Sequence, residues 1–144
     1  DPLSSTFIDS NIFIAFANKK DRDHNRSLEL LDRVRKREIT PAYTSDYVFD
    51  ETVTTALIRT RRPSTAVKAG KLILGSEDEG IPRLVRIIRV DERIFSEAWK
   101  TFKTERFEGL SFTDHTILAQ LREFRIDTVT SFDSAFDGLA TRLS

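Results

Sequence analysis

Short apolar runs alternate along the chain with longer segments in which apolar residues recur every three or four positions. Residues 6–9, 41–44, 84–90 and 126–131 form such short runs, with β-branched or aromatic residues, and each run predicts a strand. The longer segments are amphipathic, as at Leu28, Leu31 and Val34, which have charged residues between them. We expect helices to begin near residues 10, 23, 45, 64, 91, 111 and 133.

Predicted strands and helices alternate over the whole chain. This order predicts an α/β fold, a three-layer α/β/α sandwich with a short, mainly parallel central sheet. The length of 144 residues suits one hydrophobic core, and no linker, repeat or low-complexity tract divides the sequence. We therefore expect a single domain over residues 1–144.

Composition narrows the choice of function only a little. Apolar residues make up 39% of the chain and include 11 phenylalanines, enough for a folded core. The 23 basic residues balance the 23 acidic ones, so any RNA contact must rest on local basic patches. The absence of cysteine excludes disulfides and zinc–thiolate sites, and no apolar stretch approaches about 18 residues. We expect a cytoplasmic protein without a membrane span.

Four acidic residues come from separate segments that would meet at one edge of a parallel sheet. Asp9 ends the first expected strand and Asp133 follows the last, while Glu51 and Asp114 lie near the starts of helices. Ligands bind beyond the carboxyl ends of the strands in such sheets. Clustered carboxylates repel one another unless a cation neutralises them, and an all-oxygen site suits Mg²⁺ or Mn²⁺. Such a site suits phosphodiester hydrolysis, because a metal activates water and stabilises the reacting oxygens.

Four short motifs carry a resemblance to a known family. Residues 7–11 (FIDSN) form an apolar strand that ends in Asp-x-Asn, and residues 48–51 (VFDE) form an apolar run that ends in a second acid. Residues 110–114 (LSFTD) carry the third acid, and residues 129–136 (VTSFDSAF) carry the fourth. In this order, over residues 7–136, the motifs resemble those of the PIN-domain family.

The resemblance implies an α/β/α fold, a ribonuclease that depends on Mg²⁺ or Mn²⁺, and often a homodimer. In the VapC-type toxin branch it also implies a small inhibitory antitoxin. By position it implies four catalytic metal ligands: Asp9, Glu51, Asp114 and Asp133. It also implies supporting hydrogen bonds from Asn11 and Ser131. The departures are small: Thr is commoner at the position of Ser131, and His115 stands where a small residue is usual.

Neighbouring acids leave two assignments open. Asp46 and Asp50 lie close to Glu51 in sequence, and either could take its place as a ligand. Asp137 follows Asp133 by four residues, on the same face if the last helix is regular. It could assist a second metal, although a solvated helix position is the simpler interpretation.

Other residues could contact the substrate or serve only the fold. His115, beside the third acid, could contact a phosphate. Arg59, Arg61 and Arg62 could bind RNA phosphates, since such contacts need positive charge but carry no sequence code. Trp99 lies at helical spacing from three other apolar residues: Ile94, Phe95 and Phe102. We interpret this group as core or dimer interface rather than as a base-stacking platform.

Three other functions compete with that of an RNA-cleaving enzyme. A phosphatase of the haloacid dehalogenase type also has a strand-end Asp, but it needs a second acid at the position of Asn11. A receiver domain expects an acidic pair near the start of the chain and a late Lys after a strand, and neither is found. A non-catalytic PIN-like module that binds RNA or a protein is the third alternative, although all four acids are present.

Overall fold

A sheet of five short strands lies at the centre of the computed structural model, which describes residues 5–104 and 109–144. The strands are β1 (Thr6–Ile8), β2 (Ala42–Ser45), β3 (Arg86–Ile88), β4 (Thr128–Thr130) and β5 (Thr141–Leu143). Their order across the sheet is β3-β2-β1-β4-β5, and every neighbouring pair runs parallel. The predicted parallel sheet is confirmed.

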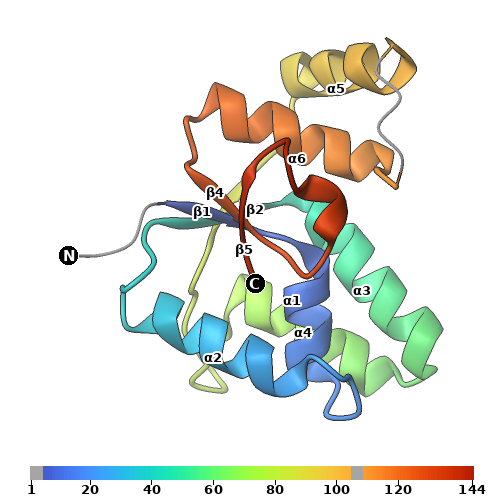
Figure 1. Cartoon of the computed structure of the whole chain (residues 1–144). Coiled ribbons are helices and arrows are strands. Elements are labelled where there is room, and N and C mark those ends of the chain that lie inside the picture. The colour runs from blue at the N-terminus through green and yellow to red at the C-terminus, as the bar shows by residue number, and fades with distance from the viewer. Residues whose placement is uncertain (1–4, 105–108) are drawn as a thin grey trace.

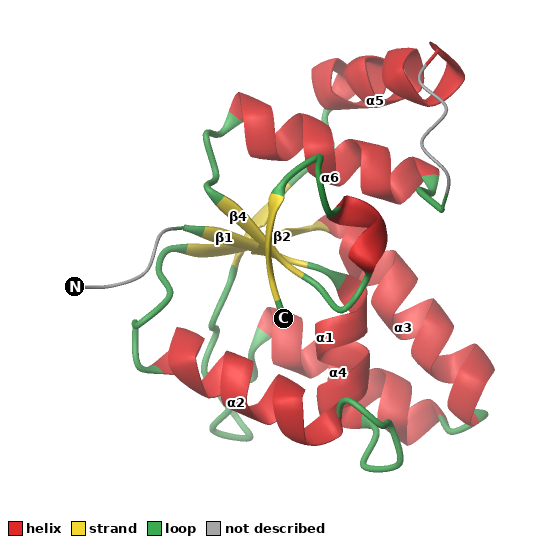
Figure 2. Cartoon of the chain, in the orientation of Figure 1, coloured by secondary structure: helices red, strands yellow, loops and turns green. Residues whose placement is uncertain are grey.

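Helices cover both faces of this sheet (Figure 1, Figure 2). On one face lie α1 (Ser10–Ala17), α2 (His24–Arg35), α3 (Asp46–Thr60) and α4 (Pro63–Leu74), and α1 contacts the other three. On the other face lie α5 (Glu92–Thr104) and α6 (Phe112–Glu123), which contact each other. The predicted three-layer α/β/α sandwich is confirmed. None of the helices in the described parts of the chain has the length and apolar character needed to cross a membrane.

Several elements differ from their predicted extent. The apolar runs at residues 84–90 and 126–131 contain strands of only three residues, β3 and β4. The last predicted helix is a single 3-10 turn, η1 (Ser134–Phe136). Strand β5 was not predicted, because its sequence TRL has no apolar run; it forms by backbone pairing with β4. In α2, Leu30 is buried and Leu28 is exposed, so Leu28 was wrongly placed on the apolar stripe.

The chain changes its direction across the sheet between β1 and β4. Strands β1, β2 and β3 follow one another towards one edge, and the chain then crosses to the other side of β1 to form β4 and β5. The backbone N–H of Asp9 donates to Thr130 O (3.0 Å), so the pairing of β1 with β4 continues one residue beyond β1. A topological switch point of this kind leaves a crevice beyond the carboxyl ends of the strands.

The two central strands are buried by helices on both sides. Phe7 and Ile8 of β1 and Val129 of β4 are fully buried in the main core. Such apolar strands are typical of parallel sheets whose two faces are covered. The polar residues of these strands find partners within the sheet, and the hydroxyls of Thr6 and Thr130 are 2.7 Å apart.

The outer face of α5 departs from the sequence prediction. Ile94 is buried, but Phe95, Trp99 and Phe102 remain 46%, 50% and 42% exposed. A core position is therefore wrong for these three residues, because α5 is an outer helix that packs against α6 (Figure 1). Their rings contact one another and the start of α6: Trp99 stacks on Phe102 with centroids 6.1 Å apart, and Phe95 lies 5.3 Å from Phe112.

We predict that the hydroxyls of Thr6 and Thr130 stabilise the fold as a pair. Thr6→Val should lower the free energy of unfolding by about 1–3 kcal/mol, because it removes the partner of the buried Thr130 hydroxyl. Adding Thr130→Val should recover part of this loss, since both polar groups are then gone. Urea unfolding of the wild type, the two single variants Thr6→Val and Thr130→Val, and the double variant measures these differences. Strictly additive losses would contradict the prediction.

Candidate functional site

Asp9 lies at the point where β1 ends and α1 begins. It is only 3% exposed and serves as the N-cap of α1, with Oδ1 accepting a hydrogen bond from Ser10 N (2.7 Å). Its other oxygen, Oδ2, accepts from Ser131 Oγ (2.7 Å) and from Asn11 Nδ2 (3.4 Å). Hydrogen bonds from three residues therefore hold this carboxylate in one orientation.

Asn11 and Ser131 join the end of β1 to the end of β4. Asn11 Nδ2 donates to Ser131 Oγ (3.1 Å), and Asn11 Oδ1 accepts from Phe132 N (3.1 Å). Ser131 Oγ also accepts from Asp133 N (3.0 Å), which draws the loop after β4 towards Asp9. The two residues expected to support the acids thus lie directly against them.

Glu51 reaches the same edge from the second turn of α3. Its Oε1 accepts a hydrogen bond from Ser10 Oγ (2.6 Å), beside Asp9. The two acids that could have replaced Glu51 as a ligand have other hydrogen-bond partners. Asp46 Oδ1 accepts from the backbone N–H of Val90, and Asp50 is exposed and accepts from the Thr54 hydroxyl. The structure therefore brings Glu51, and neither of its neighbours, to Asp9.

Asp114 is placed by the start of α6. Ser111 caps this helix, with Oγ accepting from Asp114 N (3.1 Å), while Asp114 Oδ2 accepts from Ser111 N (2.9 Å). This reciprocal pair is a capping box, which stabilises the first turn of a helix and restricts the acidic side chain. A role in capping α6 and a role in the acid cluster are compatible, because the backbone hydrogen bond of the capping box engages only Oδ2 of Asp114.

Burial, together with the charges of neighbouring acids, raises the pKa values of two members of the cluster. Burial, and then the charges of Asp114 and Glu51, raise the pKa of Asp9 to about 7, although its hydrogen bond from Ser131 acts in the opposite direction. Burial, and then the charges of Glu51 and Asp133, raise the pKa of Asp114 to about 6 against the effect of its capping hydrogen bonds. Each shift includes charges from other segments of the chain, so Asp9 interacts electrostatically with Asp114 and Glu51, and Asp114 with Glu51 and Asp133.

The donor atoms of this cluster suit a hard divalent cation. Within the described ranges, no basic side chain forms an ion pair with any of the four acids. As the side chains lie, no three Asp, Glu or His residues of residues 5–104 and 109–144 are close enough together to hold a metal ion. The chemistry still fits, because buried carboxylates with raised pKa values need a positive charge nearby to stay ionised, and oxygen donors match Mg²⁺ or Mn²⁺.

Two further candidates have other contacts. His115 is buried, and its Nδ1 lies 2.8 Å from Thr101 Oγ1, so the ring is directed towards α5. Asp137 pairs with Arg142 of β5 (2.7 Å), and this hydrogen bond lowers the pKa of Asp137. The expected common helical face of Asp133 and Asp137 is wrong, because the two residues flank the three-residue turn η1.

Two neighbours of the acids were not singled out from the sequence. Ser10, which holds Glu51, was interpreted only as a helix start, although its position inside the Asp-x-Asn motif was a signal. Arg142 donates to Ser131 O (3.1 Å), and its charge interacts with that of Asp133. No local pattern marked Arg142, because β5 itself was not predicted.

The three arginines at the end of α3 occupy different positions. Arg59 lines a hollow of about 540 Å³ whose lining includes Asn11, Phe132 and Asp133, so it lies near Asp133. Arg62 lines an adjoining hollow on the side of α4. Arg61 is not among the residues lining either hollow; it ends α3 with a left-handed backbone (φ 55°).

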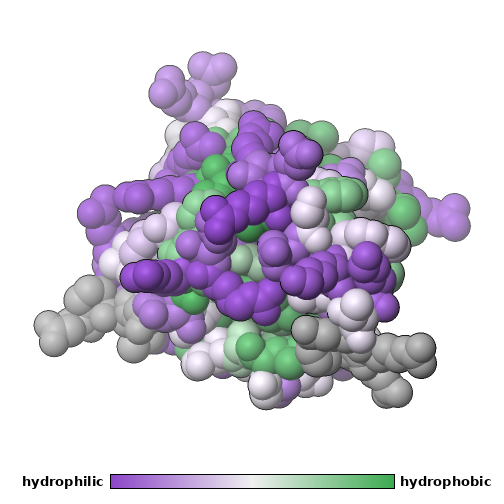
Figure 3. Space-filling view, turned by 90° about the horizontal axis from the view of Figure 1, so that it is seen from above, coloured by the Kyte–Doolittle hydropathy of each residue, from purple (hydrophilic) through white to green (hydrophobic). Residues whose placement is uncertain are grey.

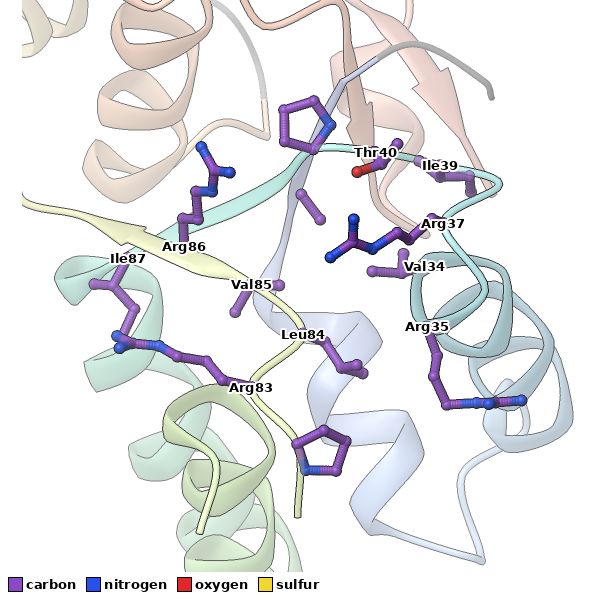
Figure 4. A pocket seen from close by; sticks show the side chains of 13 residues that line it. Val34, Arg35, Arg37, Ile39, Thr40, Arg83, Leu84, Val85, Arg86 and Ile87 are labelled. Atoms are coloured by element: carbon purple, nitrogen blue, oxygen red, sulfur yellow. The ribbon is translucent and has the colours of Figure 1, made fainter. Parts of the chain in front are cut away.

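Another hollow, of about 600 Å³, lies at the opposite edge of the sheet (Figure 4). Its lining comes from the segments that lead into β2 and β3 and includes Arg37, Arg83 and Arg86. Because the strands are parallel, this is the amino edge, away from the acids. Its lining contains no carboxylate, so we place the candidate site at the carboxyl edge.

Solved structures share this fold over nearly the whole chain. VapC20 of Mycobacterium tuberculosis, described as a toxin that cleaves the sarcin-ricin loop, has 26% sequence identity and a TM-score of 0.74, with 91% of this chain and 92% of that chain covered. FitAcB of Neisseria gonorrhoeae has 17% identity and a TM-score of 0.63, with 96% of each chain covered. VapBC2 of Rickettsia felis, bound to a promoter DNA fragment, has 12% identity and a TM-score of 0.63, with 96% of this chain and 97% of that chain covered.

Comparison of the sequence with protein families agrees with these structural similarities. A search of curated proteins found no match. The PIN domain, however, matches residues 6–141, from the start of β1 to the start of β5. That span includes all four acids and the three residues that hydrogen-bond to the Asp9 carboxylate. The chain therefore belongs to the PIN-domain family.

Proposed function

We propose that this protein is a divalent-metal-dependent endoribonuclease that hydrolyses RNA phosphodiester bonds. The observation that carries the proposal is the acid cluster at the carboxyl edge, in which the neighbouring charges help to raise the pKa of Asp9 to about 7. The similarity to VapC20, a toxin that cleaves the sarcin-ricin loop, supports RNA as the substrate. A haloacid-dehalogenase-type phosphatase is disfavoured, because the chain belongs to the PIN-domain family.

The proposed catalytic residues are also the proposed metal ligands: Asp9, Glu51, Asp114 and Asp133. They would hold Mg²⁺ or Mn²⁺, which supplies an activated water and stabilises charge on the phosphate oxygens. Three sets of hydrogen bonds position the acids: Ser131 and Asn11 orient Asp9, Ser10 orients Glu51, and the capping box orients Asp114. Such preorganisation favours catalysis, because little reorganisation is needed as charge develops.

We also propose that the protein is the toxin of a toxin–antitoxin pair. VapC20 is described as a toxin, and the solved structures of VapBC2 and FitAcB share the fold. An RNA-processing nuclease without an antitoxin has the same site. A non-catalytic module that binds RNA or a protein is the alternative, and the acid cluster argues against it, because a module that only binds RNA gains nothing from clustered negative charge.

The exposed aromatic face of α5 supports a homodimer. Phe95, Trp99 and Phe102 together form a half-exposed patch, and exposed aromatic clusters are typical of protein interfaces. Viewed from above, the side on which α5 and α6 lie, apolar patches stand out from a mostly hydrophilic surface (Figure 3). We propose that a second copy of the chain covers the aromatic face of α5.

We predict that Asp9→Asn abolishes Mn²⁺-stimulated RNA cleavage and leaves the fold intact. The substitution removes the charge of the buried carboxylate with little change in shape, and the rate should fall by at least about 100-fold, as removal of metal-site partners commonly does. Glu51→Gln should have a similar effect, whereas Asp50→Asn, on the exposed side of the same helix, should cleave at the wild-type rate. Cleavage of labelled RNA with and without Mn²⁺ measures this, and an active, cleanly purified Asp9→Asn variant would refute the proposal.

We predict an unusual pH dependence of stability in the metal-free protein. The pKa of Asp9 is raised from 3.8 to about 7, so the folded state binds more protons than the unfolded state between these values. The free energy of unfolding should therefore fall as pH rises through this window. Asp9→Asn should weaken this dependence, leaving the part due to Asp114, whose pKa is raised to about 6, and should be more stable than the wild type at about pH 8 by about 1–3 kcal/mol. Thermal unfolding from pH 4 to 8 in EDTA measures it; an equal pH dependence in both proteins would contradict the prediction.

We predict that Trp99→Glu weakens self-association. Placing a charge in a buried aromatic contact should raise the dimer dissociation constant by about 30-fold or more. Phe124→Glu is the matched control, since Phe124 is 46% exposed, close to the 50% of Trp99, but follows the end of α6. Sedimentation equilibrium measures the association, and a wild-type protein that stays monomeric at all concentrations tested would disprove this arrangement.

A further inference from the structure

A basic hollow lies where the end of α1 meets the turn between α3 and α4. It encloses about 640 Å³ and is lined by five cationic side chains: Lys19, Lys20, Arg59, Arg62 and Lys68. Hydroxyl groups of Ser64 and Thr65 add hydrogen-bond donors, whereas the Thr60 hydroxyl donates to Ala56 O, and no acidic residue lines the space. The left-handed backbone of Arg61 ends α3 and turns the chain into α4, which allows residues before and after it to line the same hollow.

The five cations have no acidic partners. None of them forms an ion pair with another described residue, although eight ion pairs occur elsewhere in residues 5–104 and 109–144. All five are exposed. In a chain whose basic and acidic residues are equal in number, this is a strong local excess of positive charge. Such a patch attracts an anionic ligand through its field and its unpaired donors.

The basic hollow adjoins a second hollow that reaches Asp133 of the acid site. Arg59 lines both hollows, and the other residues lining the second are Asn11, Asp21, Arg22, Asp23, Phe132 and Asp133. Helix α1 connects the two places, with Asn11 in its first turn and Asn18 at its end. Seven residues of helix span about 10 Å at 1.5 Å per residue. A stacked nucleic-acid strand covers that distance with about three nucleotides at 3.4 Å each.

We propose that the basic hollow binds backbone phosphates of the RNA substrate about three nucleotides from the bond that is cut. This inference rests on the proposed ribonuclease function and extends it to substrate binding. Lysine, arginine and hydroxyl groups are the usual partners of phosphates, and such contacts position a strand without reading its sequence. An acidic protein segment could be attracted by the same charge. RNA is favoured because the hollow leads, through Arg59, into the place where an RNA strand must lie to be cut.

The test measures RNA binding separately from cleavage. The parent protein is the full chain with Asp9→Asn, so that the RNA stays intact, and the probe is a fluorescent single-stranded RNA of about 12 nucleotides. The test variant adds Lys19→Gln and Arg62→Gln, which remove one cation from each side of the hollow. The control instead adds Arg122→Gln and Arg125→Asn, which remove the same charge from exposed positions near the end of α6 and the amino edge of the sheet.

Fluorescence anisotropy over a range of KCl concentrations gives the affinity and its salt dependence. The test variant should bind the RNA at least about tenfold more weakly at low salt, and the slope of log K against log[KCl] should fall by about 1.4, or 0.7 per lost phosphate contact. The control variant should match the parent protein in RNA affinity and in the slope of its salt dependence. A test variant with the parent's affinity and slope would overturn the proposal. Loss of poly-glutamate binding with unchanged RNA binding would overturn it too, and would assign the hollow to an acidic protein segment.

A cleavage assay separates this inference from the proposed function. With the wild-type Asp9 restored, the two hollow substitutions should raise KM for the RNA of about 12 nucleotides, because that strand can reach the hollow from the acid site. They should leave the cleavage of a trinucleotide unchanged, since it is too short to reach the hollow. If the wild type cleaves no RNA with Mn²⁺ while the hollow substitutions still weaken binding, the ribonuclease function fails and the RNA-binding hollow stands.

Discussion

Burial of like charges beside the two central strands is the constraint on which the rest of this structure depends. Asp9 is nearly inaccessible to solvent, and two other carboxylates help to raise its pKa to about 7. Such a group disfavours the folded state at neutral pH unless it is protonated or neutralised. The fold tolerates it because Ser131, Asn11 and the start of α1 all donate hydrogen bonds to this one carboxylate. Stability is given up at the place where the proposed chemistry needs charge.

The order of the strands in the sheet explains why the buried acids, which lower stability, lie at its carboxyl edge. β1 and β4 are neighbours in space but lie more than a hundred residues apart in sequence, and the chain leaves them in different directions. The loops after them bring Asp9 and Asp133 to the same crevice, and the second turn of α3 and the first turn of α6 add Glu51 and Asp114. Each acid is held by a local hydrogen bond, either as the cap of a helix end or from a nearby hydroxyl group. The site is therefore assembled from ordinary features of helix ends and strand ends.

Charge is segregated on a molecule that is neutral as a whole. Negative charge gathers at the crevice, while unpaired cations surround the hollow between α1, α3 and α4, with Arg59 at the boundary. A phosphate strand crossing this boundary would be attracted by the cations of the hollow and repelled by the acids of the crevice, where a divalent cation would restore the balance. The aromatic face of α5 lies on the other helical layer, so the proposed dimer contact and the proposed RNA path use different layers of the sandwich.

Local patterns were sufficient for the alternation of strands and helices and for the acids at their ends, because hydrophobic periodicity and capping residues act over a few neighbouring positions. They could not show that Glu51, and not Asp50, meets Asp9, since that depends on how α3 lies against α1. Strand β5 escaped prediction because TRL has no apolar run, and only pairing with β4 makes it a strand. The exposure of Trp99 followed from the position of α5 outside α6. Which acids converge and which cations remain unpaired were decided by packing between distant segments, where local sequence carries no information.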